Sequence, residues 1–168
     1  ANLFDNLDVL SIPVRSKNPM PMEKYGQGYG LILYRKMVKG PRDYMPLVIN
    51  EVHDRAKIYL YNKFYADQTR NDEPSVVEVR VPEEGLDLSI LVENMGRVSF
   101  GHKLRDPKGI TQNVRLGQTF VYNWDVYPLP LDDISEINYT PADTFEYKEQ
   151  PQFLKAQFII EEDPCDTF

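Results

Sequence analysis

The chain has 168 residues, with 19 basic and 26 acidic side chains and a formal net charge of −7. This length is too short for a (β/α)8 barrel, which needs about 250 residues, and the acidic balance argues against binding to a nucleic-acid backbone. The sequence has no run of roughly 20 apolar residues that would span a membrane, and its single cysteine, Cys165, excludes an internal disulfide and a cysteine-based zinc site.

Apolar side chains alternate with polar ones along most of the chain, and this period of two residues is typical of β-strands. Asn62-Lys63 is expected to form a tight hairpin turn, because Asn tolerates positive φ. Many short strands joined by Gly, Pro and Asn turns favour an all-β sandwich. We predict strands at 29–37, 46–52, 56–61, 75–81, 86–92, 119–127 and 153–160, and short helical turns near 3–10 and 20–25.

Composition divides the chain into three parts. We interpret residues 1–20 as an N-terminal connecting segment and residues 21–135 as the β domain. From 132 to 150 the sequence is polar and acidic with little periodicity, as in a linker. Residues 136–168 are therefore expected to be a linker followed by the first strand of a truncated second β domain.

Candidate catalytic residues carry weak signals. Asn50-Glu51 matches a dyad of barrel-type glycosidases, but it lies on an alternating strand, where a solvated role is favoured roughly nine to one. His53 and Asp54 would point to opposite faces of a strand, so we do not expect them to pair directly. The glycines of 26–30 precede a strand and not a helix, which argues against a phosphate-binding loop. We predict no catalytic residue, no metal site and no cofactor.

The stretch 91–101, LVENMGRVSFG, begins as a buried strand and ends in a loop between two glycines. Gly96 and Gly101 allow unusual backbone angles. Between them Arg97 has several directed donors, and Phe100 is carried to a loop where an aromatic ring needs something to pack against. From the residues alone, the stretch is a sheet corner, a sugar-binding loop or a piece of an active site.

This stretch, followed by Lys108-Gly-Ile110, closely resembles a block of the β-galactosidases of glycoside hydrolase family 35. The usual form there is VENMGR, a hydrophobic residue, Asn-Tyr-Gly and later Lys-Gly. Other blocks resemble the same family in the same order, so that the resemblance covers nearly the whole chain. They are Pro21-Met-Glu23, Gly26-Gln27, 29–35, Asp54-Arg-Ala56, 124–131 and the tail from 151 to 168.

The resemblance implies a galactose-binding-domain-like jelly roll that is not an enzyme by itself. In that family two catalytic glutamates lie on a separate (β/α)8 barrel and hydrolyse terminal β-galactosides with retention. The implied partners are therefore the barrel and the last β domain of the parent chain, with a galactoside as the implied ligand. The domain is expected to pack on the barrel and to shape the edge of the galactose pocket.

Five residues are expected at this pocket edge: Phe100, Arg97, Glu93, Asn94 and Trp124. Arg97 would brace the loop, Glu93 and Asn94 would hold it by hydrogen bonds, and Phe100 would offer an apolar or stacking face. The family's usual Asn-Tyr pair is Ser99-Phe100 here, so the loop lacks an amide and a phenol hydroxyl.

Two other readings stay open. An autonomous galactose-binding module would use Phe100 or Trp124 as its sugar platform, a role that Trp124 would have roughly one time in five. A complete small glycosidase built on Glu51 or Glu93 is poorly supported. The segment 153–160 is expected to pair with the domain's own sheet or to cause self-association through its unpaired edge. We expect a cytoplasmic setting of bacterial type, with neither nucleic acid nor membrane as a partner.

Overall fold

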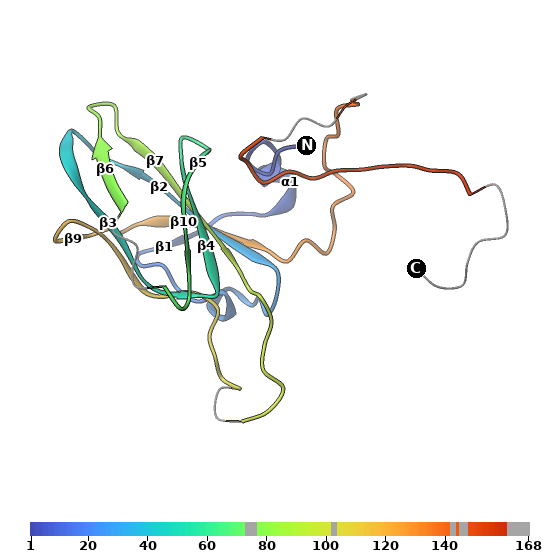
Figure 1. The fold of residues 1–168 in the computed structure, drawn as a ribbon, viewed down its shortest axis with the longest axis horizontal. Helices are drawn as coiled ribbons and strands as arrows, with labels where there is room; N and C mark the ends of the chain where they lie inside the picture. Colours follow the sequence, from blue (N-terminus) through green and yellow to red (C-terminus); the bar gives the residue numbers. More distant parts are fainter. Residues whose placement is uncertain (73–76, 102–103, 142–143, 145–147, 161–168) are drawn as a thin grey trace.

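The computed structural model describes residues 1–72, 77–101, 104–141, 144 and 148–160, and it contains two antiparallel sheets stacked face to face (Figure 1). One sheet has the strand order β1-β10-β2-β7-β4-β5 and the other has the order β6-β3-β8-β9. The predicted all-β sandwich is therefore confirmed. The strands are β1 (Val14–Ser16), β2 (Leu31–Val38), β3 (Arg42–His53), β4 (Arg55–Leu60), β5 (Lys63–Thr69), β6 (Val77–Val81), β7 (Leu86–Glu93), β8 (Gly109–Leu116), β9 (Thr119–Phe120) and β10 (Trp124–Leu129).

The main core lies between the two sheets and follows from the two-residue period. Along β2, Ile32 and Tyr34 face the core, and from the opposite sheet Leu47 and Ile49 of β3 meet them. Successive side chains of a strand point to opposite faces, so alternate residues of each strand reach this layer. The core therefore needs no long helix.

A second apolar layer covers the outer face of the six-stranded sheet. Leu33, Tyr59 and Leu91 point outward from β2, β4 and β7, and they are buried by the short helices at the N-terminus. These helices are η1 (Phe4–Asn6) and α1 (Leu7–Leu10), and a third, η2 (Met22–Tyr25), precedes β2. Because both faces of β7 are covered, the strand is buried along nearly its whole length, whereas a strand covered on one face only would alternate between buried and exposed residues.

The N-terminus meets the segment around Phe153 beside this second layer. The N-terminal ammonium of Ala1 donates a hydrogen bond of 2.9 Å to the carbonyl of Phe153, and the Phe153 N–H donates to the carbonyl of Ala1 at 2.8 Å. Residues 1–20, predicted as a connecting segment, thus carry η1, α1 and β1 and pack on the sandwich.

The structure corrects several predicted elements. The predicted strand 119–127 is two strands, because Asn123 has a left-handed φ of 62° and breaks it. Residues 153–160 are extended but form no strand in the described part of the chain, so the predicted strand there is wrong. Leu154, Phe158 and Ile159 are exposed in this segment. Strands β1 and β8 were not predicted.

The β4–β5 hairpin is confirmed, with a shift of one residue in its turn. Tyr61 and Asn62 both have positive φ, 51° and 61°, as a two-residue type I′ turn requires. Lys63 already begins β5. Among the described residues, no helix is long and apolar enough to cross a membrane.

Candidate functional site

The most distinctive surface feature is the loop between β7 and β8, described at 94–101 and 104–108 and called here the loop 94–108, whose described residues project from the end of the sandwich (Figure 1). Phe100 is 85 % exposed near its tip. Other large apolar side chains in the loop, Met95, Val98 and Leu104, are also at least half exposed. The loop therefore presents an apolar tip to solvent, which is unusual for a loop unless something covers it.

The start of the loop is fixed by Asn94. Its backbone N–H donates to the carbonyl of Gly30 at 3.2 Å, and its side-chain amide donates to the carbonyl of Gly28 at 3.1 Å. The side-chain oxygen of Asn94 accepts the Gly96 N–H at 3.0 Å, and Gly96 has a φ of 116° that favours glycine. The carbonyl of the preceding residue, Glu93, accepts the N–H of Asp54 at 3.1 Å.

Arg97 is a loop residue whose side chain bonds to three other residues, Gly28, Asp106 and Glu23. Its Nε donates to the carbonyl of Gly28 at 2.9 Å, and its Nη1 donates to the carbonyl of Asp106 at 3.1 Å. Its Nη2 is hydrogen-bonded to the carboxylate of Glu23. A planar guanidinium offers five N–H donors in a fixed fork, and here each of its three nitrogens donates a hydrogen bond.

Lys108 is the buried centre of the loop base. Its side chain is only 3 % exposed, and its Nζ lies 2.8 Å from both carboxylate oxygens of Asp54 and 3.1 Å from Asp106. Asp54 also accepts the Met95 N–H at 2.9 Å. Arg70 forms an ion pair with Asp54 at 3.2 Å and a second with Asp106. Two cations thus face two anions, which keeps each buried charge compensated.

Glu23 ties this base to the entry of β2. It accepts the Lys108 backbone N–H at 3.0 Å as well as the bond from Arg97. Beside it the buried phenol of Tyr34 donates to the carbonyl of Met20 at 2.7 Å and accepts the Ile110 N–H at 3.1 Å. Burial raises the pKa of the Tyr34 phenol, so this hydroxyl remains a neutral donor.

His53 lies at the edge of the loop base, next to Pro107. Its Nδ1 lies 2.7 Å from the carbonyl of Pro107, and its Nε2 lies 3.1 Å from the carboxylate of Glu51. A backbone carbonyl and a carboxylate are both acceptors, so a neutral imidazole, with one N–H, satisfies only one of them. As predicted, His53 does not pair with its neighbour Asp54, which bonds to Lys108 instead.

The site expected from the sequence is only partly assembled. Glu93, Asn94, Arg97 and Phe100 lie together at the loop, but Trp124 does not. Its side chain is fully buried in the core, and its indole N–H donates to the carbonyl of Val121 at 2.9 Å. Trp124 therefore offers no exposed ring to a sugar, contrary to the role considered for it above.

Five charged residues of the loop base were not predicted as site residues: Glu23, Asp54, Arg70, Asp106 and Lys108. A usable signal existed for three of them, because Glu23, Asp54 and Lys108 belong to the sequence blocks on which the family resemblance rests. Arg70 and Asp106 had no such signal.

Chemically, the base is suited to holding the loop. The carboxylates of Asp54, Asp106 and Glu23 each bond to at least one cation. The Arg70 guanidinium, with help from Lys108 and against the effect of burial, holds the pKa of the Asp106 carboxyl well below its usual range. A carboxylate with so low a pKa, as in Asp106, is a poor general acid at neutral pH. In the described part of the chain, no group of His, Cys, Asp and Glu is placed to hold a metal ion.

The loop and its base lie within the part of the chain that matches known proteins. Residues 19–130 match a family model described as "Beta-galactosidase, first all-beta domain". The chain belongs to this family of β-galactosidase domains. The matched range spans η2 to β10 and so includes the whole loop and every charged residue of its base.

Curated β-galactosidases also match this β-galactosidase domain. A relative from Xanthomonas manihotis is 36 % identical over 132 residues, which is 78 % of this chain and 21 % of the relative. A relative from Bos taurus is 34 % identical over 135 residues, 77 % of this chain and 20 % of the relative. "Beta-galactosidase 17" of Arabidopsis thaliana is 31 % identical over 155 residues, which is 86 % of this chain and 21 % of the relative. The matched part is thus about a fifth of each of these relatives.

From the ion pairs of the loop base we predict that the domain loses folding stability in acid. Because the folded-state pKa of Asp106 lies below its ordinary value of 3.8, its ion pairs contribute their full stability above that value and lose it as the pH falls. We expect the urea midpoint to drop between about pH 5 and pH 2, and to drop less steeply in Asp106→Asn. Asp43→Asn, at an exposed position of β3, is the control and should keep the wild-type slope. Equal acid slopes for all three proteins would contradict this assignment.

Proposed function

We propose that this chain is a non-catalytic accessory domain that packs on the catalytic domain of a β-galactosidase and shapes the edge of its galactose pocket with the loop 94–108. The parent enzyme would hydrolyse terminal β-galactosides with retention, using two glutamates that lie outside this sequence. The curated relatives named β-galactosidase and the family match support the general role. The finer role is supported by the geometry of the loop.

One observation carries the proposal: an apolar tip stands on a base that charged groups hold rigidly. Exposing Phe100 to solvent does not stabilise the domain by itself, so the exposed ring indicates a binding role. The contacts of Arg97 and Lys108 fix the two ends of the loop before any partner arrives, which lowers the entropy lost on docking. A preorganised loop with an aromatic side chain near its tip suits contact with a neighbouring domain and the apolar face of a sugar.

The test is a substitution in the full-length parent enzyme. Phe100→Ala is expected to raise the KM for a β-galactoside and to lower kcat/KM about tenfold, because one stacking contact is worth about 1 kcal/mol or slightly more. Phe100→Tyr keeps the ring and adds the family's usual hydroxyl, so it should retain the wild-type kcat/KM to within about twofold.

Tyr44→Ala is the matched control, since Tyr44 is also an exposed aromatic residue, at 71 %, and lies near the far end of β3 from the loop. Hydrogen exchange should also slow at 95–101 in the full-length enzyme relative to the isolated chain if the loop docks. Unchanged kinetics in Phe100→Ala together with unchanged hydrogen exchange would contradict the proposal.

A further inference from the structure

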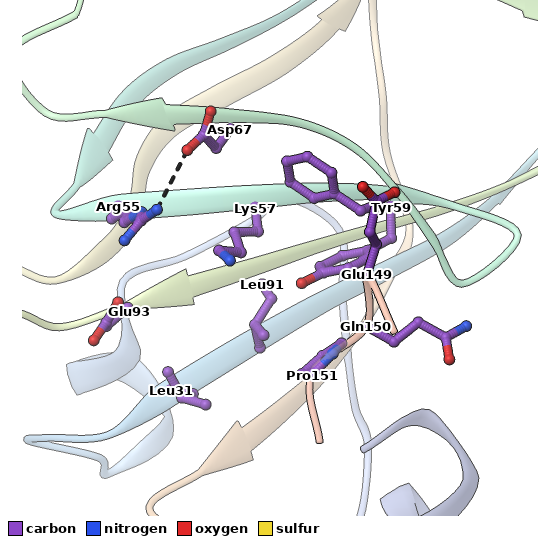
Figure 2. Close-up of a pocket in the computed structure, with 11 residues that line it drawn as sticks. Leu31, Arg55, Lys57, Tyr59, Asp67, Leu91, Glu93, Glu149, Gln150 and Pro151 are labelled. Carbon is purple, nitrogen blue, oxygen red and sulfur yellow. Dashed lines mark hydrogen bonds and ion pairs between the residues drawn. The ribbon is translucent and has the colours of Figure 1, made fainter. Parts of the chain in front are cut away.

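A groove of about 430 Å³ lies on the outer face of the six-stranded sheet, where β2, β7, β4 and β5 run side by side (Figure 2). It lies beside the second apolar layer and is separate from the loop tip. The segment Glu149 to Pro151 forms one wall of the groove. Gln150 fixes this wall, because its amide donates to the carbonyl of Asn62 at 2.8 Å and its oxygen accepts from Asn2 at 2.6 Å.

The floor of the groove is apolar and partly aromatic. Phe64 and Tyr59 meet edge to face, with ring centroids 6.0 Å apart, and Leu91 lies next to them. Phe64 is half-buried, so part of its ring remains open to a ligand. The Lys57 ammonium lies over this ring at 5.7 Å from the centroid, on a flexible stem that is able to move aside.

The rim is charged. Arg55 and Asp67 form an ion pair of 3.4 Å at one side of the groove, as Figure 2 shows, and Glu93 lies near them. Together with Lys57 and Glu149, the groove has two cations and three carboxylates. It therefore has no excess of positive charge that would attract a phosphate, sulfate or acidic sugar.

The lining also disfavours another protein surface. Five of the eleven lining residues are charged, whereas the centres of protein interfaces are depleted in Lys, Asp and Glu. Covering these charges with an apolar surface would remove their water at a large cost, and the Arg55–Asp67 ion pair would offset it for only two of the five. A neutral sugar differs, because each hydroxyl both donates and accepts, and its C–H face packs on an aromatic ring.

We propose that this groove binds a neutral galactoside chain, with a sugar face on Phe64 and with hydroxyls bonded to Lys57, Asp67 and Glu93. The volume lies within the range of about 300–1,000 Å³ that is usual for small-molecule sites. Only the choice of galactose rests on the proposed function. The groove itself lies on this chain and needs neither a catalytic domain nor the loop.

The test is a titration of the 168-residue chain with β-1,4-galactobiose, followed by two-dimensional ¹H–¹⁵N NMR. We expect saturable shifts at groove residues of β4, β5 and β7, with a dissociation constant of the order of a millimolar. Asp67→Asn and Glu93→Gln keep the shape of the groove and should each weaken binding about tenfold. Phe64→Ala should abolish binding, and its fold is checked from the spread of the spectrum.

Tyr44→Ala, an exposed aromatic position on the other sheet, is the control and should leave the affinity unchanged. Absence of saturable shifts up to roughly 20 mM, well above weak dissociation constants, would overturn the proposal. So would shifts confined to the loop 94–108, or equal affinity in Asp67→Asn, Glu93→Gln and the wild type. None of these outcomes bears on the kinetic effect of Phe100→Ala in the parent enzyme, so the two proposals fail separately.

Discussion

Lys108→Met is expected to lower the free energy of unfolding by about 3–5 kcal/mol, the usual effect of removing one partner from a buried ion pair. Methionine keeps most of the apolar stem but removes the ammonium that lies 2.8 Å from Asp54 and 3.1 Å from Asp106. The two carboxylates, only 12 % and 18 % exposed, would then share Arg70 as their remaining cation. Urea unfolding followed by circular dichroism measures the effect.

Lys24→Met is the matched control for this prediction. Lys24 is exposed at the end of η2, so the same chemical change should alter stability by less than about 0.5 kcal/mol. The assignment of Lys108 as the centre of the loop base would be wrong if both variants unfolded at the same urea concentration.

Trp124→Ala is expected to cost about 3–5 kcal/mol, the range for deleting a large aromatic side chain from a core. The indole is fully buried, packs edge to face on Tyr34 with centroids 6.5 Å apart, and donates to the carbonyl of Val121. The variant would leave both a cavity and an unpaired carbonyl. Thermal and urea unfolding should both detect the loss.

Phe100→Ala provides the comparison, because it also removes an aromatic ring, but from a position that is 85 % exposed. We expect it to change stability by less than about 0.5 kcal/mol. If Trp124→Ala were as stable as Phe100→Ala, the buried position of the indole would be incorrect.

The strands of the sandwich were largely predictable because their period of two residues reports burial directly. Strand β7 was predicted from its apolar residues, although the sequence does not reveal that its second face is covered by η1 and α1. Residues 153–160 form no strand in the described part of the chain, although their pattern predicted one. Their apolar alternation resembles a strand, but a strand also needs a neighbour, and the sequence does not specify one.

The loop was predicted from its local sequence, but its base was not. Lys108 and Asp54 are 54 residues apart, and Arg97 and Glu23 are 74 apart. Only the order of strands in the sheets brings such residues together. Arg70 carries no signal in the sequence, since it stands in an ordinary charged stretch, and its partner Asp106 is 36 residues away. Trp124 was uncertain for the same reason, because a strand pattern alone does not say which face is covered.

The anchors of the loop come from widely separated parts of the chain: Glu23 from η2, Asp54 from the junction of β3 and β4, and Lys108 from the residue before β8. No short piece of the sequence contains them all. A peptide copied from 91–110 would keep Arg97 and Phe100 but would lose Glu23 and Asp54, and with them the shape of the loop. The apolar tip is therefore a property of the complete sandwich and cannot be transplanted as a linear motif.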